Sequence, residues 1–370
     1  MDSYKLENCC EILDSQRVPI TGSDRNAGEY PYYGANGIQD FVDDFIFEDE
    51  LVLLAEDGGN FGSKTRSIAY RVSGKCWVNN HAHVLKPKKY IDVDYLCYSL
   101  MFYNVGSMVN GATRQKLTQA AMRQMLIPKR EMHEQQEIVA ILKKCQEVIQ
   151  LREQQIDQFN TLIKARFVEM FGDIIQNEKG WITKKFSDIT SSRLGKMLDA
   201  KQQTGKYLNP YLANFNVQWF SFNIENLNQM DFDEKEQVEF ELQDGDLLVC
   251  EGGEIGRCAV WHNEIQHCYF QKAIHRVRCN QRYIMPDYLS WWFKYNCDYG
   301  GFTAIEGAKA TIAHLPGVKL KALIVATPPL NLQKQFAAFV QQVDKSKVAV
   351  QKSLEATQLL FDSLMQKYFG

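Results

Sequence analysis

Several features that mark other classes of protein are missing from this sequence of 370 residues. Its ten cysteines form no C-x-x-C pair, and Cys250, Cys258, Cys268 and Cys279 are spaced like core-facing strand residues, so we expect buried thiols and no metal site. No apolar run approaches the roughly 18 residues that a membrane span requires. The first residues, MDSYK, form neither a basic leader nor an apolar signal core. We therefore expect a soluble, cytoplasmic protein that contacts no membrane.

Complete catalytic motifs are missing as well. The sequence has no H-E-x-x-H, no nucleophile elbow and no G-x-G-x-x-G after a strand. Gly62-Ser63-Lys64-Thr65 resembles the end of a phosphate-binding loop, but Asp57 stands where that loop needs its first glycine. Residues 327–330, Thr-Pro-Pro-Leu, lack the acid or amide and the aromatic ring of the Asn/Asp-Pro-Pro-aromatic loop of amino-methyltransferases. We expect no catalytic residue in this chain.

A surplus of positive charge is also absent, since 42 Lys and Arg residues stand against 45 Asp and Glu residues and give a net charge of -3. Phosphate neutralisation usually gives a nucleic-acid-binding domain a basic character, so this balance argues mildly against that function. Acidic helical faces can mask basic loops in a sum over the whole chain, and partner subunits can supply positive surface. The local distribution of charge therefore matters more than the total.

What the sequence does contain is a duplication. Residues 53–62 return as 248–256, residues 94–96 as 287–289, residues 110–113 as 306–309 and residues 132–135 as 330–333, in the same order. Residues 185–189 likewise repeat residues 5–9. Between these shared blocks the two copies diverge strongly. A duplicated unit favours a target that is itself bipartite.

A long helix is predicted at the end of each copy. From Met132 to Phe171 there is neither proline nor glycine, and apolar residues recur at helical spacing. The heptad positions of the first helix are Ile138, Leu142, Cys145, Ile149, Arg152, Ile156, Phe159, Ile163, Arg166 and Met170. Those of the second are Phe336, Val340, Val343, Lys347, Val350, Leu354, Thr357, Phe361, Leu364 and Tyr368. Two apolar stripes in one register predict a coiled-coil pair, and the connectivity makes the pair antiparallel.

The predicted fold class is α/β (α+β). Two mixed α/β domains, with several short strands each, are separated by two long helices in an antiparallel coiled coil with a pseudo-twofold internal repeat. We expect the first domain at residues 1–130, the first spacer helix at 131–172, a hinge at 173–180, the second domain at 181–328 and the second spacer helix at 329–370. About 35 helical residues would make a rod of about 50 Å.

Three segments carry a resemblance to a known family. Residues 328–336, PPLNLQKQF, followed by Val343-Asp344-Lys345-Ser346, look like the entry to that family's second helix. Residues 163–173, IKARFVEMFGD, look like the end of its first helix, and residues 251–256, EGGEIG, resemble its recurrent glycine loop. The whole chain is similar to the specificity subunits of type I restriction-modification systems. The first copy departs from the pattern at Pro128-Lys129, where a second proline is usual.

The resemblance implies a prokaryotic DNA-recognition protein whose two domains are target recognition domains, each reading half of a split site in double-stranded DNA. It also implies partners: two modification (methyltransferase) subunits, which flip and methylate adenines on opposite strands, and restriction/translocase subunits that move along and cut DNA. No cofactor is expected on this chain, and S-adenosylmethionine, ATP and Mg are expected on the partner subunits.

Base readout needs donors and acceptors on loops, whereas phosphates need only cations. The DNA-binding candidates in the first copy are Lys64, Arg66, Asn79, Asn80, Asn110, Thr113, Arg114, Gln115 and Lys116. Those in the second copy are Arg193, Lys196, Lys206, Arg257, Gln271, Lys272, Lys309 and Thr311. Arg114, Lys116 and Lys309 are favoured among them because they follow the same glycine in both copies. Solvated surface residues are the competing interpretation for every position.

His83 and His275 occupy equivalent places in the repeat, each in an alternating apolar run. We favour hydrogen-bonded structural histidines, with a DNA-facing role as the alternative. Two alternatives to a DNA-specificity subunit also stay open for the whole chain: a stand-alone DNA-modifying enzyme with one active copy, and a structural coiled-coil adaptor. The missing motifs argue against the enzyme, and the divergence between the copies argues against the adaptor.

Overall fold

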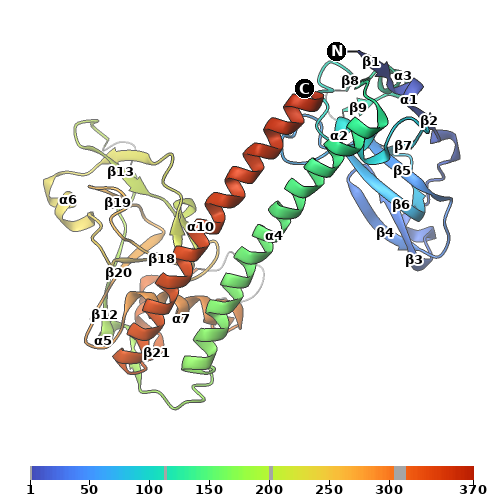
Figure 1. The fold of residues 1–370 in the computed structure, drawn as a ribbon. Coiled ribbons are helices and arrows are strands. Elements are labelled where there is room, and N and C mark those ends of the chain that lie inside the picture. The colour runs from blue at the N-terminus through green and yellow to red at the C-terminus, as the bar shows by residue number, and fades with distance from the viewer. Residues whose placement is uncertain (1, 112–114, 200–202, 304–313) are drawn as a thin grey trace. The chain divides into compact units, whose positions relative to one another are not determined.

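The computed structural model describes residues 2–111, 115–199, 203–303 and 314–370, and the chain divides into two compact units (Figure 1). The first unit comprises residues 1–155 and 350–370, and the second comprises residues 156–349. Each unit thus combines one globular domain with about half of each long helix, α4 (Met132–Phe171) and α10 (Leu330–Phe369). Among the described helices, none is both long enough and apolar enough to cross a membrane.

The globular part of the first unit is built on a six-stranded sheet with the strand order β2-β7-β5-β6-β3-β4. These strands are β2 (Cys10–Ile12), β3 (Ala27–Gly34), β4 (Gly37–Val42), β5 (Phe47–Ala55), β6 (Ala69–Val78) and β7 (Ala82–Pro87). Two small antiparallel pairs are added, β1 (Ser3–Lys5) with β10 (Leu126–Pro128) and β8 (Val109–Asn110) with β9 (Lys116–Leu117). The helices are α1 (Leu6–Cys9), α2 (Val93–Met101) and α3 (Gln119–Arg123), with the short 3-10 turns η1 (Asp14–Gln16) and η2 (Gly22–Asp24).

The second unit has a four-stranded sheet of order β12-β20-β17-β18 and a three-stranded sheet of order β16-β13-β19. The first contains β12 (Thr190–Leu194), β17 (Leu247–Cys250), β18 (Cys258–Val260) and β20 (Ile274–Cys279), and the second contains β13 (Leu208–Leu212), β16 (Asn228–Asp231) and β19 (Tyr269–Phe270). Small pairs are β11 (Thr183–Lys185) with β21 (Ile324–Ala326) and β14 (Val217–Gln218) with β15 (Ser221–Phe222). The helical elements are α5 (Phe186–Ile189), η4 (Asn214–Asn216), α6 (Glu234–Phe240), α7 (Pro286–Asp298) and α9 (Gly317–Ala322).

The duplication predicted from the sequence is present as a repeated framework. Strand order β2-β7-β5-β6 in the first unit is matched by β12-β20-β17-β18 in the second. The backbone hydrogen bonds that hold the framework also recur: the amide of Leu117 donates to the carbonyl of Glu56 at 2.7 Å, and that of Leu315 donates to Glu251 at 2.6 Å. Both copies therefore have one fold at their centre, as the repeated blocks predict.

The units differ in what is attached to this framework. In the first, β3 pairs in parallel with β6 and extends the same sheet. In the second, the chain between β12 and β17 builds the separate sheet of β13, β16 and β19, with its own buried cluster around Phe232, Tyr269 and Trp261. These are stretches that do not align between the copies, so sequence divergence here corresponds to different local folds.

Each long helix has 40 residues, and the heptad positions predicted for both are buried or half-buried throughout. In the first unit, Ile138 and Leu142 of α4 share a buried cluster with Phe361 and Met365 of α10. In the second unit, Phe167 of α4 packs against Phe336 of α10 at 5.4 Å between ring centroids. Since the start of one helix meets the end of the other in both units, the helices pack antiparallel, as predicted.

Two polar heptad positions have partners that explain their place in the seam, which is the line of heptad positions along which α4 and α10 pack together in each unit. Lys347 donates to Oδ1 of Asn160 on the facing helix at 2.8 Å. The guanidinium of Arg166 lies over the ring of Phe339, 5.8 Å from its centroid. The apolar stems of these long side chains can then pack within the seam while their charged ends keep polar or aromatic contacts.

A buried glutamine at the start of each long helix joins that helix to its own domain. Gln135 donates from Nε2 to the carbonyls of Tyr90 and Arg130 and accepts from the amide of Asp92 through Oε1, at 2.8–3.0 Å. Gln333 makes the same three bonds, to the carbonyls of Tyr283 and Pro328 and from the amide of Met285, at 2.7–3.0 Å. Both side chains are 0% exposed. Gln135 and Gln333, whose match sets the register of the repeat, therefore also make equivalent contacts in the two units.

The turn after α4 is tied by hydrogen bonds. Gly172 has φ 72°, a conformation that suits glycine after a helix, and its amide donates to the carbonyl of Val168 at 2.7 Å. The ammonium of Lys179 donates to the helix carbonyls of Glu169 and Met170 at 2.6 and 3.1 Å. These bonds satisfy carbonyls that the helix end leaves open. The boundaries proposed for the domains and for a hinge at 173–180 stay predictions.

The ten cysteines are free thiols, eight of them buried, which confirms the expectation of buried thiols. Burial raises the pKa of Cys97 and of Cys76 to about 12, so both stay protonated at neutral pH.

Candidate functional site

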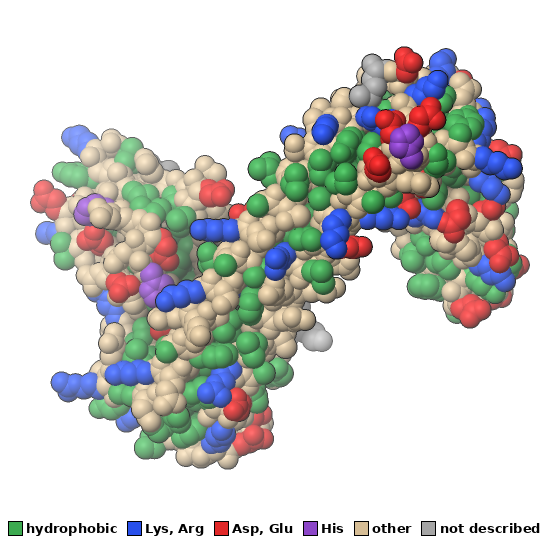
Figure 2. Space-filling model, in the orientation of Figure 1, with side chains coloured by type: hydrophobic (Ala, Val, Ile, Leu, Met, Phe, Trp, Pro, Cys, Tyr) green, Lys and Arg blue, Asp and Glu red, His purple; other side chains and the backbone are tan. Residues whose placement is uncertain are grey.

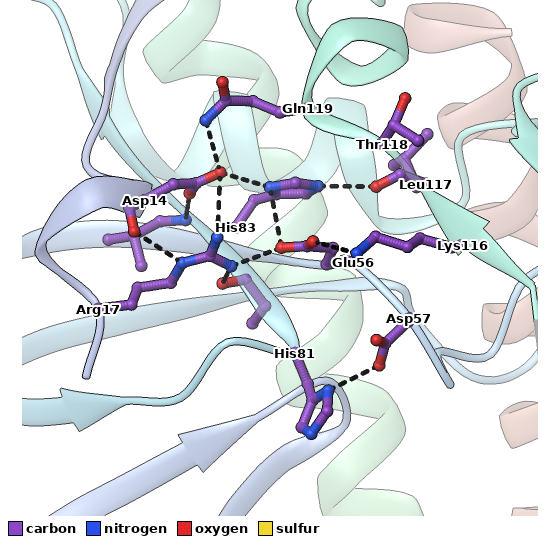
Figure 3. A network of polar contacts seen from close by, with 12 residues as sticks. Asp14, Arg17, Glu56, Asp57, His81, His83, Lys116, Leu117, Thr118 and Gln119 are labelled. Atoms are coloured by element: carbon purple, nitrogen blue, oxygen red, sulfur yellow. Dashed lines mark hydrogen bonds and ion pairs between the residues drawn. The ribbon is translucent and has the colours of Figure 1, made fainter. Parts of the chain in front are cut away.

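A network of polar side chains surrounds His83 in the first unit, at the point where β2, β5, β7 and β9 meet (Figure 3). Nδ1 of His83 lies 2.6 Å from Oδ2 of Asp14, and Nε2 lies 2.9 Å from the carbonyl of Leu117. Both partners are acceptors, so the ring makes both hydrogen bonds only with a proton on each nitrogen. His83 is 0% exposed. The prediction of a hydrogen-bonded structural histidine is confirmed.

Two cations complete the network by pairing with Glu56. Nη1 of Arg17 donates to Oε2 of Glu56 at 2.6 Å and to the carbonyl of Ala82 at 2.7 Å. Nζ of Lys116 lies 2.9 Å from the other oxygen, Oε1. Each carboxylate of the network thus faces several donors, which is what a buried charge requires.

The donors outweigh burial in their effect on the two carboxyl groups. Burial raises the pKa of Asp14, but hydrogen bonds from His83, the amide of Val84 and the amide of Gln119 lower it below its usual value. Burial likewise raises the pKa of Glu56, and hydrogen bonds from Arg17 and Lys116 lower it below its usual value. Both groups are therefore ionised at neutral pH.

Asp14, Glu56 and His83 each place a possible metal-ligand atom within 4.8 Å of the others. The space between them already holds a cation, because the Arg17 guanidinium pairs with Glu56 and its Nη2 lies 3.6 Å from Asp14. A metal ion would have to displace Arg17 and the proton on Nδ1 of His83. We interpret this cluster as an ion-paired support for the end of β2 and for β9, which carries the predicted DNA contact Lys116.

The equivalent histidine of the second unit has different surroundings. Nε2 of His275 lies 3.0 Å from the carbonyl of Leu315, as Nε2 of His83 does from that of Leu117, and the side chain is 2% exposed. Burial lowers the pKa of His275, the Leu315 carbonyl and Glu251 oppose this, and the result lies below the usual value. The ring is therefore neutral at pH 7, with Nε2 as the donor, and this histidine too is structural.

Most of the DNA-binding residues predicted in the first copy are exposed. They are Lys64, Arg66, Asn80, Asn110, Gln115 and Lys116. Asn79 is instead buried: it donates to Oε1 of Gln39 at 3.0 Å and accepts from the amide of His81 at 2.8 Å. Thr113 and Arg114 lie outside the described residues. A contact between DNA and Asn79 would first have to break these bonds, so Asn79 is the weakest of the predicted contacts.

In the second copy, the structure brings three predicted residues into one cleft. Arg193, Lys196 and Lys272 line a depression with a volume of about 630 Å³. Lys206 is exposed outside this lining, and Gln271 is half-buried. Lys309 and Thr311 lie outside the described residues.

Arg257, predicted from its place after the glycine loop, bonds within the protein. Its Nη2 donates to the carbonyl and to Oδ1 of Asn214 at 3.0 and 3.1 Å. The loop before it turns through Gly253 and Gly256, with φ 79° and 77°. Arg257 therefore holds the glycine loop against η4. None of these DNA contacts is tested by the structure, and all stay predictions.

Sequence reasoning did not name Lys321 as a site residue. This lysine lies on the short helix α9 and lines the cleft, as does His275, for which a DNA-facing role is the alternative interpretation from the sequence. The only signal for Lys321 is the Lys-x-Lys pattern of residues 319–321, which is too common to single out a site. The contact of α9 with β12, more than 100 residues earlier in the chain, is what places Lys321 in the cleft.

Charged side chains of both signs lie on the face of the molecule that Figure 2 shows. On the face shown in Figure 2, the described Lys and Arg side chains are interspersed with Asp and Glu side chains and do not form one continuous basic surface. This agrees with the net charge of -3 and makes local groups of cations, such as that of the cleft, the places where an anionic partner is expected.

Comparisons with known proteins give one consistent result. The family model of the type I restriction modification DNA specificity domain matches the chain twice, over residues 1–161 and 178–357. A Haemophilus influenzae protein named as a type I restriction enzyme specificity subunit is 28% identical over 392 residues, which cover 98% of this chain and 92% of that protein.

Two solved structures have a similar fold. The S subunit of a type I restriction-modification system from M. genitalium has a TM-score of 0.62 at 13% identity, with 100% of this chain and 96% of that chain covered. A chain from a study of complex assembly and conformational transition in a type I restriction-modification system has a TM-score of 0.57 at 14% identity, with 100% and 97% covered. With two domain matches over most of its length, the chain belongs to the family of type I restriction modification DNA specificity domains.

Proposed function

We propose that this chain reads a bipartite DNA sequence within a type I restriction-modification complex, with one half-site contacted by each unit. The observation that carries the proposal is the repeated framework with different attachments: β2-β7-β5-β6 and β12-β20-β17-β18 share strand order, whereas the segments around β3–β4 and β13–β19 differ in fold. The shared four-stranded framework would place each domain on the DNA in the same way. The attached segments, which differ between the domains, would let each domain read a different base sequence. The antiparallel helices would set the gap between the half-sites.

We infer that the long helices also bind the partner subunits. Away from the seam, large apolar side chains of both helices are exposed: Ile141, Leu151, Leu359 and Leu360 in the first unit, and Leu162, Val168 and Val348 in the second. Exposed apolar side chains along a helix are typical of protein–protein contact surfaces. Two such surfaces on repeated units would accept two modification subunits, which would carry S-adenosylmethionine, and restriction subunits would carry ATP and Mg.

A methylation assay separates this function from that of a stand-alone DNA-modifying enzyme. The chain with S-adenosylmethionine and duplex DNA is expected to transfer no methyl group, because its sequence contains none of the complete catalytic motifs that we searched for. Addition of the modification subunit of the same system is expected to give methylated adenines on both strands of one sequence. Methyl transfer by the isolated chain would contradict the proposal.

A further inference from the structure

The cleft of the second unit lies at the end of β12, in the place that the His83 network occupies in the first unit. Its walls come from β12 and the residues after it, from α6, from the loop between β19 and β20, and from α9. Leu194 pairs with His275 across β12 and β20, while in the first unit Asp14 follows β2 and bonds to His83. The equivalent position thus carries a carboxylate in the first unit and an apolar side chain in the second.

The lining of the cleft carries four cations and two carboxylates. Arg193 pairs with Glu239, and Lys196 pairs with Glu236 while donating to the carbonyl of Asp231 at 2.6 Å. The other two cations are Lys272 and Lys321. Among the described residues, no carboxylate lies within 4 Å of either ammonium group. Within the described part of the chain, Lys272 and Lys321 therefore have no carboxylate partner in the cleft and can pair with an anion from outside.

The backbone holds Lys272 beside Lys196 by close packing at Gly195. A Cβ atom at Gly195 would lie 2.3 Å from the carbonyl oxygen of Gln271, so no larger residue fits there. The amide of Lys272 donates to the carbonyl of Lys196 at 2.8 Å, and the amide of Lys196 donates to that of Phe270 at 3.2 Å. A cation presented on a fixed backbone loses less conformational entropy when it binds an anion.

Two features of the lining favour a phosphate group over a whole nucleotide. Phe240 and His275, the aromatic rings of the described lining, are both buried, and the Arg193 guanidinium lies over Phe240 at 5.5 Å from its centroid. A base therefore finds no open ring on which to stack. Lysine ammonium groups act as point charges, which suits phosphate oxygens but does not specify a base.

We propose that this cleft binds a backbone phosphate of the DNA through Lys272 and Lys321, and that the first unit has no equivalent contact. This inference rests on the proposed function, since it assigns part of the same DNA interface. It makes the two recognition units unequal: the first closes this position with its own carboxylates and Arg17, and the second leaves it open for an anion. One half-site would then be held by an additional phosphate clamp.

The salt dependence of DNA binding tests the proposal. For the complex of this chain with its modification subunit, Lys272→Gln/Lys321→Gln is expected to reduce the slope of log K against log salt concentration by about 1, because the loss of one phosphate contact removes about 0.9. Binding to the cognate site and to unrelated duplex should weaken by similar factors. Lys185→Gln, an exposed lysine on β11 of the same unit, is the matched control and should leave the slope unchanged.

A hydroxyl-radical footprint shows where on the DNA the double variant loses its backbone contact. The double variant is expected to lose backbone protection at one half-site and to keep it at the other. If the double variant has the same salt slope and the same footprint as the wild type, and the wild type binds its site specifically, the phosphate site is overturned and the proposed function is not. Absence of site-specific binding by the wild-type complex would instead overturn the proposed function.

Calorimetry without DNA separates the two possible sources of phosphate. Titration with inorganic phosphate and with ATP is expected to show only millimolar binding to the wild-type chain. Micromolar ATP binding that is lost in the double variant, together with an unchanged slope for DNA, would assign the cleft to a free nucleotide and overturn the DNA assignment.

Discussion

Replacement of Asp14 by asparagine is expected to lower the free energy of unfolding of the first unit by about 3 kcal/mol at neutral pH, since removal of one partner from a buried ionic group typically costs about 3–5 kcal/mol. The carboxylate accepts from the amide of Val84 at one oxygen, and from His83 and Gln119 at the other. Asparagine offers one acceptor oxygen and one NH₂ group, so at least one of these donors would face another donor.

The loss of unfolding free energy in Asp14→Asn should depend on pH, because Asp14 is ionised only above its pKa. The pKa of Asp14 lies below its usual value in the folded protein, so its charge stabilises the fold above the unfolded-state pKa of about 3.9. This contribution is lost as the pH falls through the lower folded-state pKa. Asp14→Asn lacks the group, so the difference between the two proteins should be full at pH 7 and should shrink below about pH 4.

Urea unfolding followed by circular dichroism at pH 7 and at pH 3.5 measures both effects. Asp43→Asn, which changes an exposed carboxylate between β4 and β5 of the same unit, is the control and should unfold as the wild type does. Equal stability of Asp14→Asn and wild type at pH 7 would show that the network around His83 contributes nothing to the fold.

Replacement of Gln333 by leucine is expected to cost about 3 kcal/mol of stability in the second unit. Leucine keeps much of the volume but leaves the amide of Met285 and the carbonyls of Tyr283 and Pro328 without their partner in a fully buried position. Each unsatisfied buried polar group costs about 1–3 kcal/mol. Thermal unfolding and peptide-level hydrogen exchange at the start of α7 measure the loss.

The repeat supplies a second variant with the same expected result. Gln135→Leu should destabilise the first unit by a similar amount, because Gln135 makes the same three bonds. Gln335→Leu, at an exposed position two residues further along α10, is the matched control. If both buried variants unfold at the wild-type temperature, these glutamines do not hold the helices to their domains.

The sequence predicts the duplication and the two long helices because these depend on local signals. Proline and glycine are absent from Met132 to Phe171, and the heptad positions of both helices are buried or half-buried as their spacing predicts. The match of Gln135 with Gln333 sets the register between the two copies of the repeat. The sequence shows that these two residues are equivalent, but it does not show the hydrogen bonds that they make. The reason is that a polar residue in a helical pattern indicates neither its burial nor its partners.

The contacts around the candidate sites could not be predicted, because they join distant segments. Asp14 meets His83 across 69 residues, and Lys321 reaches the cleft of Arg193 from the far end of the second domain. Asn79 and Arg257 have the residue types of DNA contacts, yet both bond within the protein. Residue type and loop position thus identify the candidates, and only tertiary structure shows which of them have other partners.

The central claim is that DNA recognition is divided between the two units, and a hydroxyl-radical footprint tests it most directly. The chain is assembled with its modification subunit, and the DNA is the duplex that this complex selects from a pool of random sequences. Two protected segments of different sequence, separated by an unprotected gap of constant length, are the predicted result. A single continuous protected segment, or protection without sequence preference, would contradict it.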